Sequence, residues 1–220
     1  MSMNILTERQ QQFLELFATQ KSLSGQFCLS GGTALATYYL PYRYSEDLDF
    51  FCLEPIDLES IVVFLRSSKD KLGYKKVESN TSFNRNLFFL HFPEEILKTE
   101  FTYFPFPPIE SPVIKGGIKV DSLIDIATNK LFTIYQNPRA RDFTDLFMIN
   151  RQRQLDVADL INKARLKFDW QVDPIKLGSQ FLLVNELKDY PRLIEQLDPA
   201  DWQAFFIDEA RKLGSEIINS

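Results

Sequence analysis

The first 120 residues combine helix-like and strand-like patterns of apolar positions. Thr7 and Gln10 have the spacing of a capping box, and the apolar residues that follow repeat at helical spacing, so a helix is expected to begin there. The predicted helices of this half cover 7–19, 34–40 and 57–73. Short apolar or alternating runs predict strands over 27–29, 47–53, 74–77, 87–92, 96–103 and 113–120, with a proline-rich loop over 105–112.

After Asp121 the strand-like patterns stop and only helical spacing remains. Prolines separate these helices, because proline cannot continue a helix. The predicted helices cover 122–136, 142–151, 155–168, 174–187 and 202–218. We therefore expect an α+β fold with two domains, a mixed sheet with flanking helices over 1–120 and a helical bundle over 121–220.

The composition narrows the class of protein. The chain has 220 residues, of which 45% are hydrophobic and 25% charged, values typical of soluble globular proteins. Twenty phenylalanines predict a core built on aromatic packing. His91 is the only histidine, which argues against Ser-His-Asp or Cys-His catalysis and against a multi-histidine zinc site. A metal site in this chain is expected to use oxygen ligands and to hold Mg²⁺ or Mn²⁺.

Charge and cysteine content predict a cytoplasmic protein. The formal net charge is -5, which argues against strong generic binding to nucleic acid. Cys28 and Cys52 lie in apolar runs and are expected to be buried, reduced thiols. The first residues lack the pattern of a signal peptide, and no apolar run has the length of a membrane span, so no association with a membrane is expected.

The run Asp47-Leu48-Asp49-Phe50 is the most informative stretch of the sequence. Side chains alternate between the two faces of a strand, so both aspartates are expected on one face and both apolar residues on the other. Two carboxylates about 7 Å apart suit a divalent cation between them. The alternative is a strand with one solvated face, although aspartate is disfavoured in strands.

Ser30-Gly31-Gly32-Thr33 lies between a predicted strand and a predicted helix. Glycines let the backbone approach a ligand closely, and N–H groups at a helix N-terminus attract anions such as phosphate. The Ser30 and Thr33 hydroxyls are further candidates for phosphate contacts. The alternative is a plain turn in which one hydroxyl caps the helix. Together with the aspartate pair, the segment predicts a phosphate site next to a metal site.

These motifs resemble those of the nucleotidyltransferase fold, and of the AbiEii/AbiGii toxin family in particular. The matching residues are Gly31-Gly32-Thr33-Ala34-Leu35, then Arg43, Ser45 and Asp47-Leu48-Asp49-Phe50, then Lys130 and Arg141-Asp142-Phe143-Thr144-Asp145-Leu146. They run in order from about residue 29 to residue 147. The first motifs are shared by many nucleotidyltransferases, and Lys130 with the Arg-Asp-Phe-x-Asp-Leu run narrows the resemblance to this family.

The resemblance implies roles for individual residues. Asp47 and Asp49 would hold the metal, with Glu100 as a third carboxylate from a neighbouring strand. Ser30, Gly31, Gly32 and Thr33 would seat phosphates, and Arg43 would brace the loop or contact phosphate. Lys130 falls on the apolar stripe of its helix, where a lysine must reach water, a carboxylate or a cleft. Under the resemblance it contacts the triphosphate or a catalytic carboxylate, Asp142 positions or deprotonates the acceptor hydroxyl, and Asp145 is structural.

The resemblance also implies an activity. We expect an Mg²⁺- or Mn²⁺-dependent enzyme that transfers NMP from an NTP to an acceptor hydroxyl. It would be the toxin of a bacterial toxin–antitoxin or phage-defence pair, with tRNA as a candidate acceptor and an antitoxin as partner. One alternative is a small-molecule acceptor of the aminoglycoside type, which the acidic net charge favours slightly. Another is a nucleotidyltransferase fold that binds without catalysis.

Overall fold

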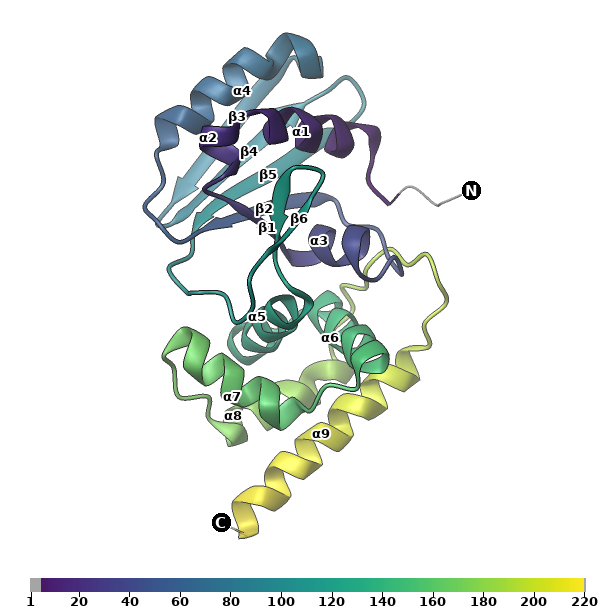
Figure 1. Ribbon diagram of the computed structural model, residues 1–220. Coiled ribbons are helices and arrows are strands. Elements are labelled where there is room, and N and C mark those ends of the chain that lie inside the picture. Colours follow the sequence, from purple (N-terminus) through teal and green to yellow (C-terminus); the bar gives the residue numbers. More distant parts are fainter. Residues whose placement is uncertain (1–4, 220) are drawn as a thin grey trace. The chain divides into compact units, whose positions relative to one another are not determined.

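The computed structural model describes the backbone of residues 5–219 and the side chains of residues 5–215. The chain divides after Ser122 into two compact units, 1–122 and 123–220 (Figure 1). The first unit contains a mixed sheet with helices, and the second is built from helices. The observed fold is the α+β fold that the sequence predicts.

The sheet of the first unit has seven described strands in the order β3-β4-β5-β2-β1-β7-β6. Two of its neighbouring pairs, β2 with β5 and β1 with β7, are parallel, and the others are antiparallel. The strands are β1 Cys28–Ser30, β2 Asp47–Cys52, β3 Lys76–Ser82, β4 Arg85–His91, β5 Ile96–Tyr103, β6 Val113–Lys115 and β7 Ile118–Val120.

Local capping accounts for where the helices of the first unit begin. At the start of α1, the Thr7 side chain accepts from the Gln10 N–H and the Gln10 side chain accepts from the Thr7 N–H, which completes the predicted capping box. Asp57 caps α4 in a similar way, and Gly73 ends it in the left-handed conformation. The helices are α1 Glu8–Thr19, α2 Lys21–Ser24, α3 Gly31–Tyr38 and α4 Leu58–Leu72.

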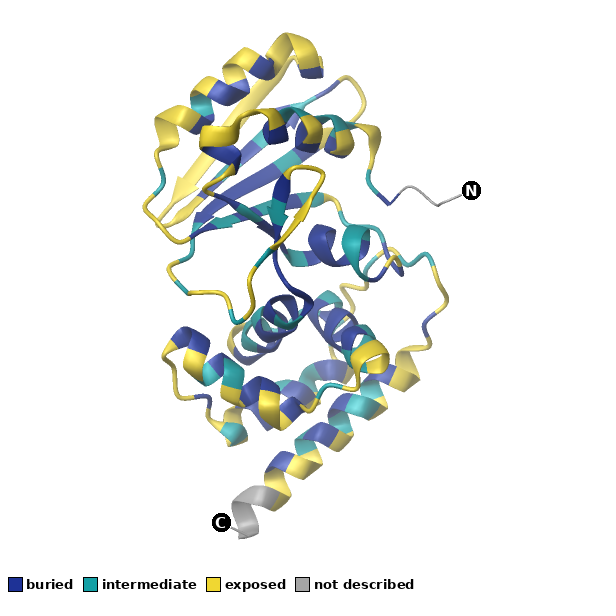
Figure 2. Ribbon diagram, in the orientation of Figure 1, coloured by how far each residue is buried: buried dark blue, intermediate teal, exposed yellow. Residues whose placement is uncertain are grey.

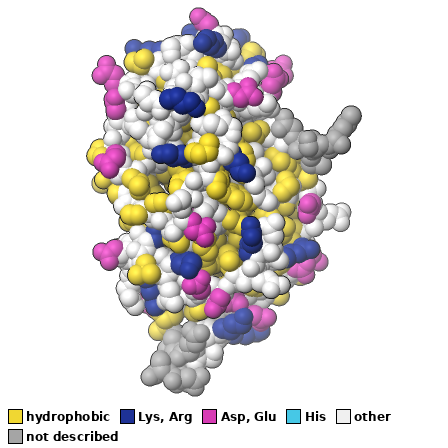
Figure 3. Space-filling model, in the orientation of Figure 1, with side chains coloured by type: hydrophobic (Ala, Val, Ile, Leu, Met, Phe, Trp, Pro, Cys, Tyr) yellow, Lys and Arg dark blue, Asp and Glu magenta, His cyan; other side chains and the backbone are white. Residues whose placement is uncertain are grey.

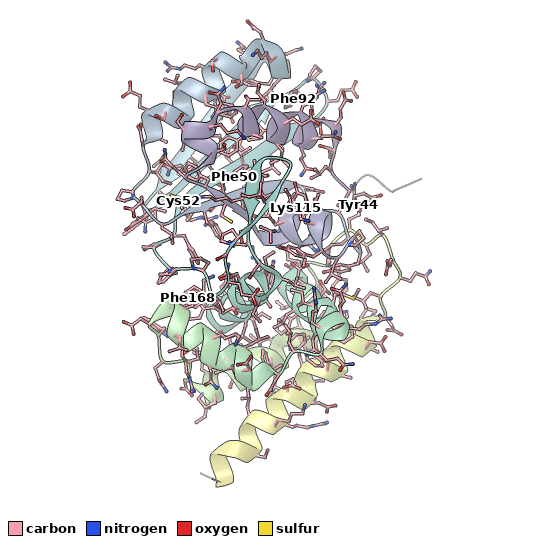
Figure 4. The ribbon with its side chains drawn as sticks, viewed as in Figure 1. Tyr44, Phe50, Cys52, Phe92, Lys115 and Phe168 are labelled. Atoms are coloured by element: carbon pink, nitrogen blue, oxygen red, sulfur yellow. The ribbon has the colours of Figure 1, made fainter. Side chains whose placement is uncertain are left out.

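Aromatic rings fill the space between the sheet and α1 and α4. Phe17 of α1 is fully buried, and its ring centroid lies 4.7 Å from that of Phe50 and 5.5 Å from that of Phe64. Phe50 and Phe101, on neighbouring strands, stack at 5.0 Å. Figure 2 shows the centre of the sheet as buried, and Phe50 is labelled in Figure 4. The predicted aromatic core is therefore present, and it lies against one face of the sheet.

The second unit is a group of helices around its own aromatic core. Its helices are α5 Leu123–Gln136, α6 Ala140–Arg153, α7 Val157–Phe168, α8 Pro174–Leu182, a 3₁₀ turn at Leu183–Asn185 and α9 Pro199–Asn219. Phe143 of α6 packs edge-on against Phe206 of α9, with ring centroids 4.7 Å apart, and both are fully buried. Among the described helices, none is both long enough and apolar enough to cross a bilayer.

Several predicted elements differ from the observed ones. The 113–120 run is a hairpin of β6 and β7, because Gly116 and Gly117 have positive φ angles that suit a tight turn. Helix α3 begins at Gly31, three residues earlier than its apolar pattern indicates. The strand predicted over 74–77 is Lys76–Ser82, and the helix predicted over 174–187 ends at Leu182.

Cys28 is half-buried and its Sγ lies 3.1 Å from Asp121 Oδ1, whereas Cys52 is buried as expected.

Phe17 provides a test of the aromatic core. We expect Phe17→Ala to lower the free energy of unfolding by about 3–5 kcal/mol, because it removes a fully buried ring that touches several others. Urea denaturation measures the change. Phe83→Ala is the matched control, since Phe83 is fully exposed; a similar loss in both variants would contradict this account of the core.

Candidate active site

Strand β2 presents its two aspartates on the face opposite the aromatic core. Asp47 and Asp49 are half-buried, whereas Leu48 and Phe50 between and after them are fully buried. The strand therefore shows the alternation that its sequence predicts. The cause is hydrophobic, because burial of the two apolar side chains leaves the opposite face to the carboxylates.

Pairing in the sheet places Asp49 in the middle of a row of polar residues. Its Cα partner on β1 is Ser30, and its Cα partner on β5 is Glu100. Neighbouring strands lie about 4.8 Å apart, so the row spans about 10 Å. Residues separated by as many as 70 positions in the chain are thus brought together at one level of the sheet.

The two glycines of α3 make room for charged side chains. Gly31 has φ +67°, and a β-carbon there would lie 2.6 Å from Asp49 Oδ2. At Gly32, a β-carbon would collide with the guanidinium of Arg43. The positive φ and the nearby Asp49 carboxylate favour glycine at the first position, and at the second the Arg43 guanidinium fills the space that a side chain would take.

Only one of the two candidate hydroxyls at the start of α3 is available to a ligand. Thr33 Oγ1 donates a hydrogen bond to the Asp47 carbonyl, so its proton is engaged within the fold, and a contact from Thr33 to phosphate stays a prediction. Ser30 Oγ is buried and makes no hydrogen bond to any described residue. A buried polar group without a partner is uncommon and unfavourable, so Ser30 has the capacity to bind a ligand oxygen.

Arg43 braces the segment between α3 and β2. Its side chain is buried, and its Nη1 donates to the Tyr44 carbonyl at 2.8 Å. The same segment is tied to α1, because Gln10 Nε2 donates to the Ser45 carbonyl at 2.8 Å. Of the two roles expected for Arg43, the structure favours bracing.

Glu100 is buried and bound by two partners. Arg85 donates to it through Nε at 2.6 Å and Nη2 at 2.7 Å, and Thr102 Oγ1 donates at 2.8 Å. Burial raises the pKa of Glu100, but the hydrogen bonds from Arg85 and Thr102 and the charges of Arg85 and Lys98 together hold it below its usual value. Glu100 is therefore ionised at neutral pH, and both of its oxygens are engaged.

Asp47 also has a basic partner on the neighbouring strand. Lys98, its Cα partner on β5, places Nζ 2.6 Å from Asp47 Oδ2, and both side chains are partly exposed. Lys98 and Arg85 were not predicted as site residues. Alternation along 98–100 predicts that Lys98 and Glu100 share one face of their strand. That Lys98 lies beside Asp47 depends on the parallel pairing of β2 with β5, which no local sequence pattern predicts.

The oxygens of Asp47 and Asp49 suit a hard divalent cation. Among the described residues, no group of three or more His, Cys, Asp or Glu side chains is arranged to hold a metal ion. Mg²⁺, however, is commonly held by one or two carboxylates together with substrate phosphates. The aspartate pair fits that pattern. Both oxygens of Glu100 are bound by Arg85 in this structure, so a metal ion here would be held by the two aspartates.

Within the second unit, Lys130 is buried between two aspartates of α6. Its Nζ lies 2.7 Å from Asp142 Oδ1 and 2.7 Å from Asp145 Oδ2, and both aspartate side chains are fully buried. Arg139, another residue that was not predicted, donates to Asp142 from Nε at 2.7 Å and from Nη2 at 3.2 Å. Lys130 thus contacts carboxylates, one of the arrangements that its place on an apolar stripe indicates.

The burial of Asp142 bears on its expected role. Both of its carboxylate oxygens accept hydrogen bonds from Lys130 and Arg139, and its side chain has no exposed surface. This arrangement suits Asp142 to the positioning of Lys130 and Arg139 rather than to direct deprotonation of an acceptor. Asp145 is fully buried and contacts Lys130, and its structural role stays a prediction.

The fold and the family follow from comparison with known proteins. A crystal structure assigned as a nucleotidyltransferase from H. pylori superimposes with a TM-score of 0.62 at 20% identity, covering 97% of this chain and 98% of that chain. The crystal structure of JHP933 from Helicobacter pylori gives 0.60 at 21% identity, covering 97% and 95%. A search of curated proteins finds no significant match. The protein has the nucleotidyltransferase fold.

The family model described as the nucleotidyl transferase AbiEii toxin of type IV toxin–antitoxin systems matches residues 12–214. The match covers most of the chain, including the strand with Asp47 and Asp49 and the helices with Lys130 and Asp142. The chain belongs to the AbiEii nucleotidyltransferase toxin family.

Lys130 provides a test of the buried charge cluster. We expect Lys130→Ala to lower the free energy of unfolding by about 3–5 kcal/mol, because two fully buried carboxylates lose a shared counter-ion. Lys163→Ala, which removes a more exposed i,i+4 pair with Asp159, is the control and should change it by less than about 1 kcal/mol. Equal losses, measured by chemical denaturation, would show that the cluster contributes no more than a surface ion pair.

Proposed function

We propose that the protein transfers a nucleoside monophosphate from an NTP to a hydroxyl group of an acceptor. The acceptor oxygen forms a bond to the α-phosphorus, the bond from that phosphorus to the bridging oxygen breaks, and pyrophosphate leaves. The proton of the hydroxyl passes to solvent. The proposal rests on membership of the AbiEii family and on the arrangement of residues at the start of α3 and on β2.

The observation that carries the proposal is the Ser30 hydroxyl beside Asp49, which has no hydrogen-bond partner in the part of the chain that the structure describes. Ser30 precedes the first turn of α3, where backbone N–H groups and the helix dipole favour an anion. Its side chain makes no capping hydrogen bond, although serine commonly does so at this position. A phosphate oxygen would satisfy the hydroxyl, and Gly31 and Gly32 would allow the phosphate to approach the backbone.

Asp47 and Asp49 are the proposed ligands of Mg²⁺, with Mn²⁺ as an alternative ion. The bound ion would supply neutralisation of the phosphate charge in the transition state. Lys98 holds Asp47 in place on the strand and offsets part of the negative charge of this face until the metal–nucleotide binds. Glu100 acts through Arg85 rather than as a ligand, in contrast to the role expected from the sequence.

Lys130 is the proposed cation for the leaving pyrophosphate, and Asp142 and Asp145 are its positioning residues. Two hydrogen-bonded carboxylates hold the Nζ atom in a fixed place, and 10% of the Lys130 side chain stays exposed. Arg139 retains 40% exposure of its side chain while it is bound to Asp142, and it offers a second cation in the same cluster.

The proposed acceptor is RNA, with tRNA as a candidate, and the proposed partner is a cognate antitoxin. The antitoxin is supported by the type IV toxin–antitoxin family to which the chain belongs, and RNA is the acceptor that the resemblance of the sequence motifs implies. Figure 3 shows basic and acidic side chains interspersed on the visible face, so with a net charge of -5 an RNA acceptor would have to bind through individual cations such as Arg139, whose side chain is 40% exposed.

The activity is tested by incubation with each labelled NTP, Mg²⁺ and total RNA. We expect Asp49→Asn to lower transfer by about a thousandfold or more, because charge stabilisation by a bound metal contributes several kcal/mol. Asp70→Asn, a change at an exposed position of α4, is the matched control. Absence of transfer by the wild type with every NTP, or equal transfer by both variants, would contradict the proposal.

Ser30→Ala separates ligand binding from folding. We expect it to weaken binding of Mg²⁺-NTP about tenfold, because a hydrogen bond to a charged oxygen is lost. It should leave the stability of the ligand-free protein unchanged or slightly higher, since the hydroxyl has no partner in the described structure. Thr33→Val should instead destabilise the protein, because its hydroxyl donates to the Asp47 carbonyl. Thermal unfolding with and without Mg²⁺-NTP measures both effects.

A further inference from the structure

The hairpin of β3 and β4 has an unusual residue at its tip. Ser82 and Arg85 are paired, so the turn consists of Phe83 and Asn84. Phe83 is 102% exposed and has φ 52°. Every residue of β3 is exposed as well, and Figure 2 shows this edge strand as an exposed band.

Folding does not explain a phenylalanine at this position. A two-residue turn in which only the first central residue has positive φ favours glycine there. A bulky residue with positive φ is an outlier that adds backbone strain, and a fully exposed ring adds no burial in return. A strained position of this kind points to a use for the ring outside the fold.

The tip of the hairpin that carries Phe83 has no acidic residue of its own, although Glu100 and Asp49 lie on the neighbouring strands β5 and β2. Residues 79–93 contain no Asp or Glu, although the whole chain has 30 of them. Near its tip the hairpin carries exposed, uncharged side chains that can form hydrogen bonds, namely Asn80, Thr81, Ser82 and Asn84, and one permanent cation, Arg85.

Glu100 orients the guanidinium of Arg85, which stays partly exposed to solvent. Glu100 binds its Nε and Nη2 in a two-point contact, which leaves Nη1 outside the pair, and 58% of the Arg85 side chain is exposed. A buried carboxylate that orients an exposed guanidinium restricts its rotamers, so less entropy is lost when the guanidinium binds phosphate. Arg85 also lies close enough to Asp49 for the aspartate charge to act on it.

The hairpin is continuous with the proposed catalytic face. Arg85 is paired with Thr102 on β5, and Glu100 on the same strand is the Cα partner of Asp49. An acceptor strand that extends from the carboxylate pair over Arg85 would therefore meet Phe83 at the end of the hairpin.

We propose that the β3–β4 hairpin binds single-stranded RNA, with Phe83 stacked on a base and Arg85 paired with a phosphate. The inference rests on the proposed function, for which it names a place where the RNA acceptor binds. One exposed ring among uncharged polar groups and a preformed arginine suits a nucleotide chain, whose bases stack and whose phosphates repeat. A protein partner would require a larger apolar surface than this tip offers.

The test uses the full chain without NTP and a fluorescein-labelled 12-nucleotide single-stranded RNA with a free 3′ hydroxyl. We expect Phe83→Gly to weaken binding about five- to tenfold, as measured by fluorescence anisotropy, because a stacked base is lost. Glycine suits the backbone of this turn, so the melting temperature should stay the same or rise. Phe83→Trp should retain the affinity.

Arg85→Gln tests the phosphate contact through salt dependence. Loss of one phosphate contact should reduce the slope of log affinity against log salt by about 0.7 for a single strand. The double variant Arg85→Gln/Glu100→Gln avoids a buried, unpaired carboxylate and should give the same slope. Val63→Ala and Arg66→Gln, at exposed positions of α4, are the matched controls and should bind RNA as the wild type does.

Wild-type affinity in Phe83→Gly, or a wild type that binds no RNA, overturns the inference. The inference is also overturned if Phe83→Gly leaves RNA binding unchanged and instead abolishes binding of the chain to a protein. The proposed function is tested by a separate measurement, the thermal stabilisation of the protein by Mg²⁺-NTP, which should be lost in Asp49→Asn. NTP stabilisation without RNA binding would therefore reject the hairpin contact alone, and RNA binding without NTP stabilisation would reject the proposed function alone.

Discussion

The candidate site depends on the burial of the apolar face of β2. Leu48 and Phe50 have no exposed surface, and the burial of each contributes about 1.5–3 kcal/mol relative to an exposed position. A slip of the strand by one residue would move both to solvent and would bury Asp47 and Asp49. The aromatic contacts that stabilise the first unit therefore also determine where its carboxylates point, and a separate device for orienting them is not required.

A second constraint is that buried or crowded charges need partners. On the open face of the sheet, Lys98 binds Asp47 and Arg85 binds Glu100. Within the second unit, Lys130 is shared by two aspartates, and Lys167 of α7 pairs with Asp125 of α5, with both side chains almost completely buried. Breaking such a pair leaves a charge in a poorly solvated place, which is strongly unfavourable. The pairs consequently fix the orientation of the groups that the proposed chemistry uses.

Features that depend on neighbouring residues in the chain were predictable. The capping box of α1, the extent of α4 between Asp57 and Gly73 and the alternation of β2 are each set within a few residues, and all three are observed. The family was also predictable, because its motifs consist of particular residue types in a particular order, which can be recognised in the sequence alone. The β6–β7 hairpin was missed although Gly116-Gly117 lies between two apolar runs, because those runs together have the length of one strand.

What the sequence by itself determined was the chemistry available: oxygen ligands instead of histidine, two aspartates on one strand face, and a glycine pair before a helix. The tertiary structure decided which of these groups are free to act. The Thr33 hydroxyl donates to the Asp47 carbonyl, whereas the Ser30 hydroxyl has no partner among residues 5–215. Glu100 is bound by Arg85, and Asp142 is bound by Lys130. These outcomes depend on strand pairing and helix packing between distant segments. Local patterns record only which face a side chain takes, whereas its partner is set by the element that packs against that face.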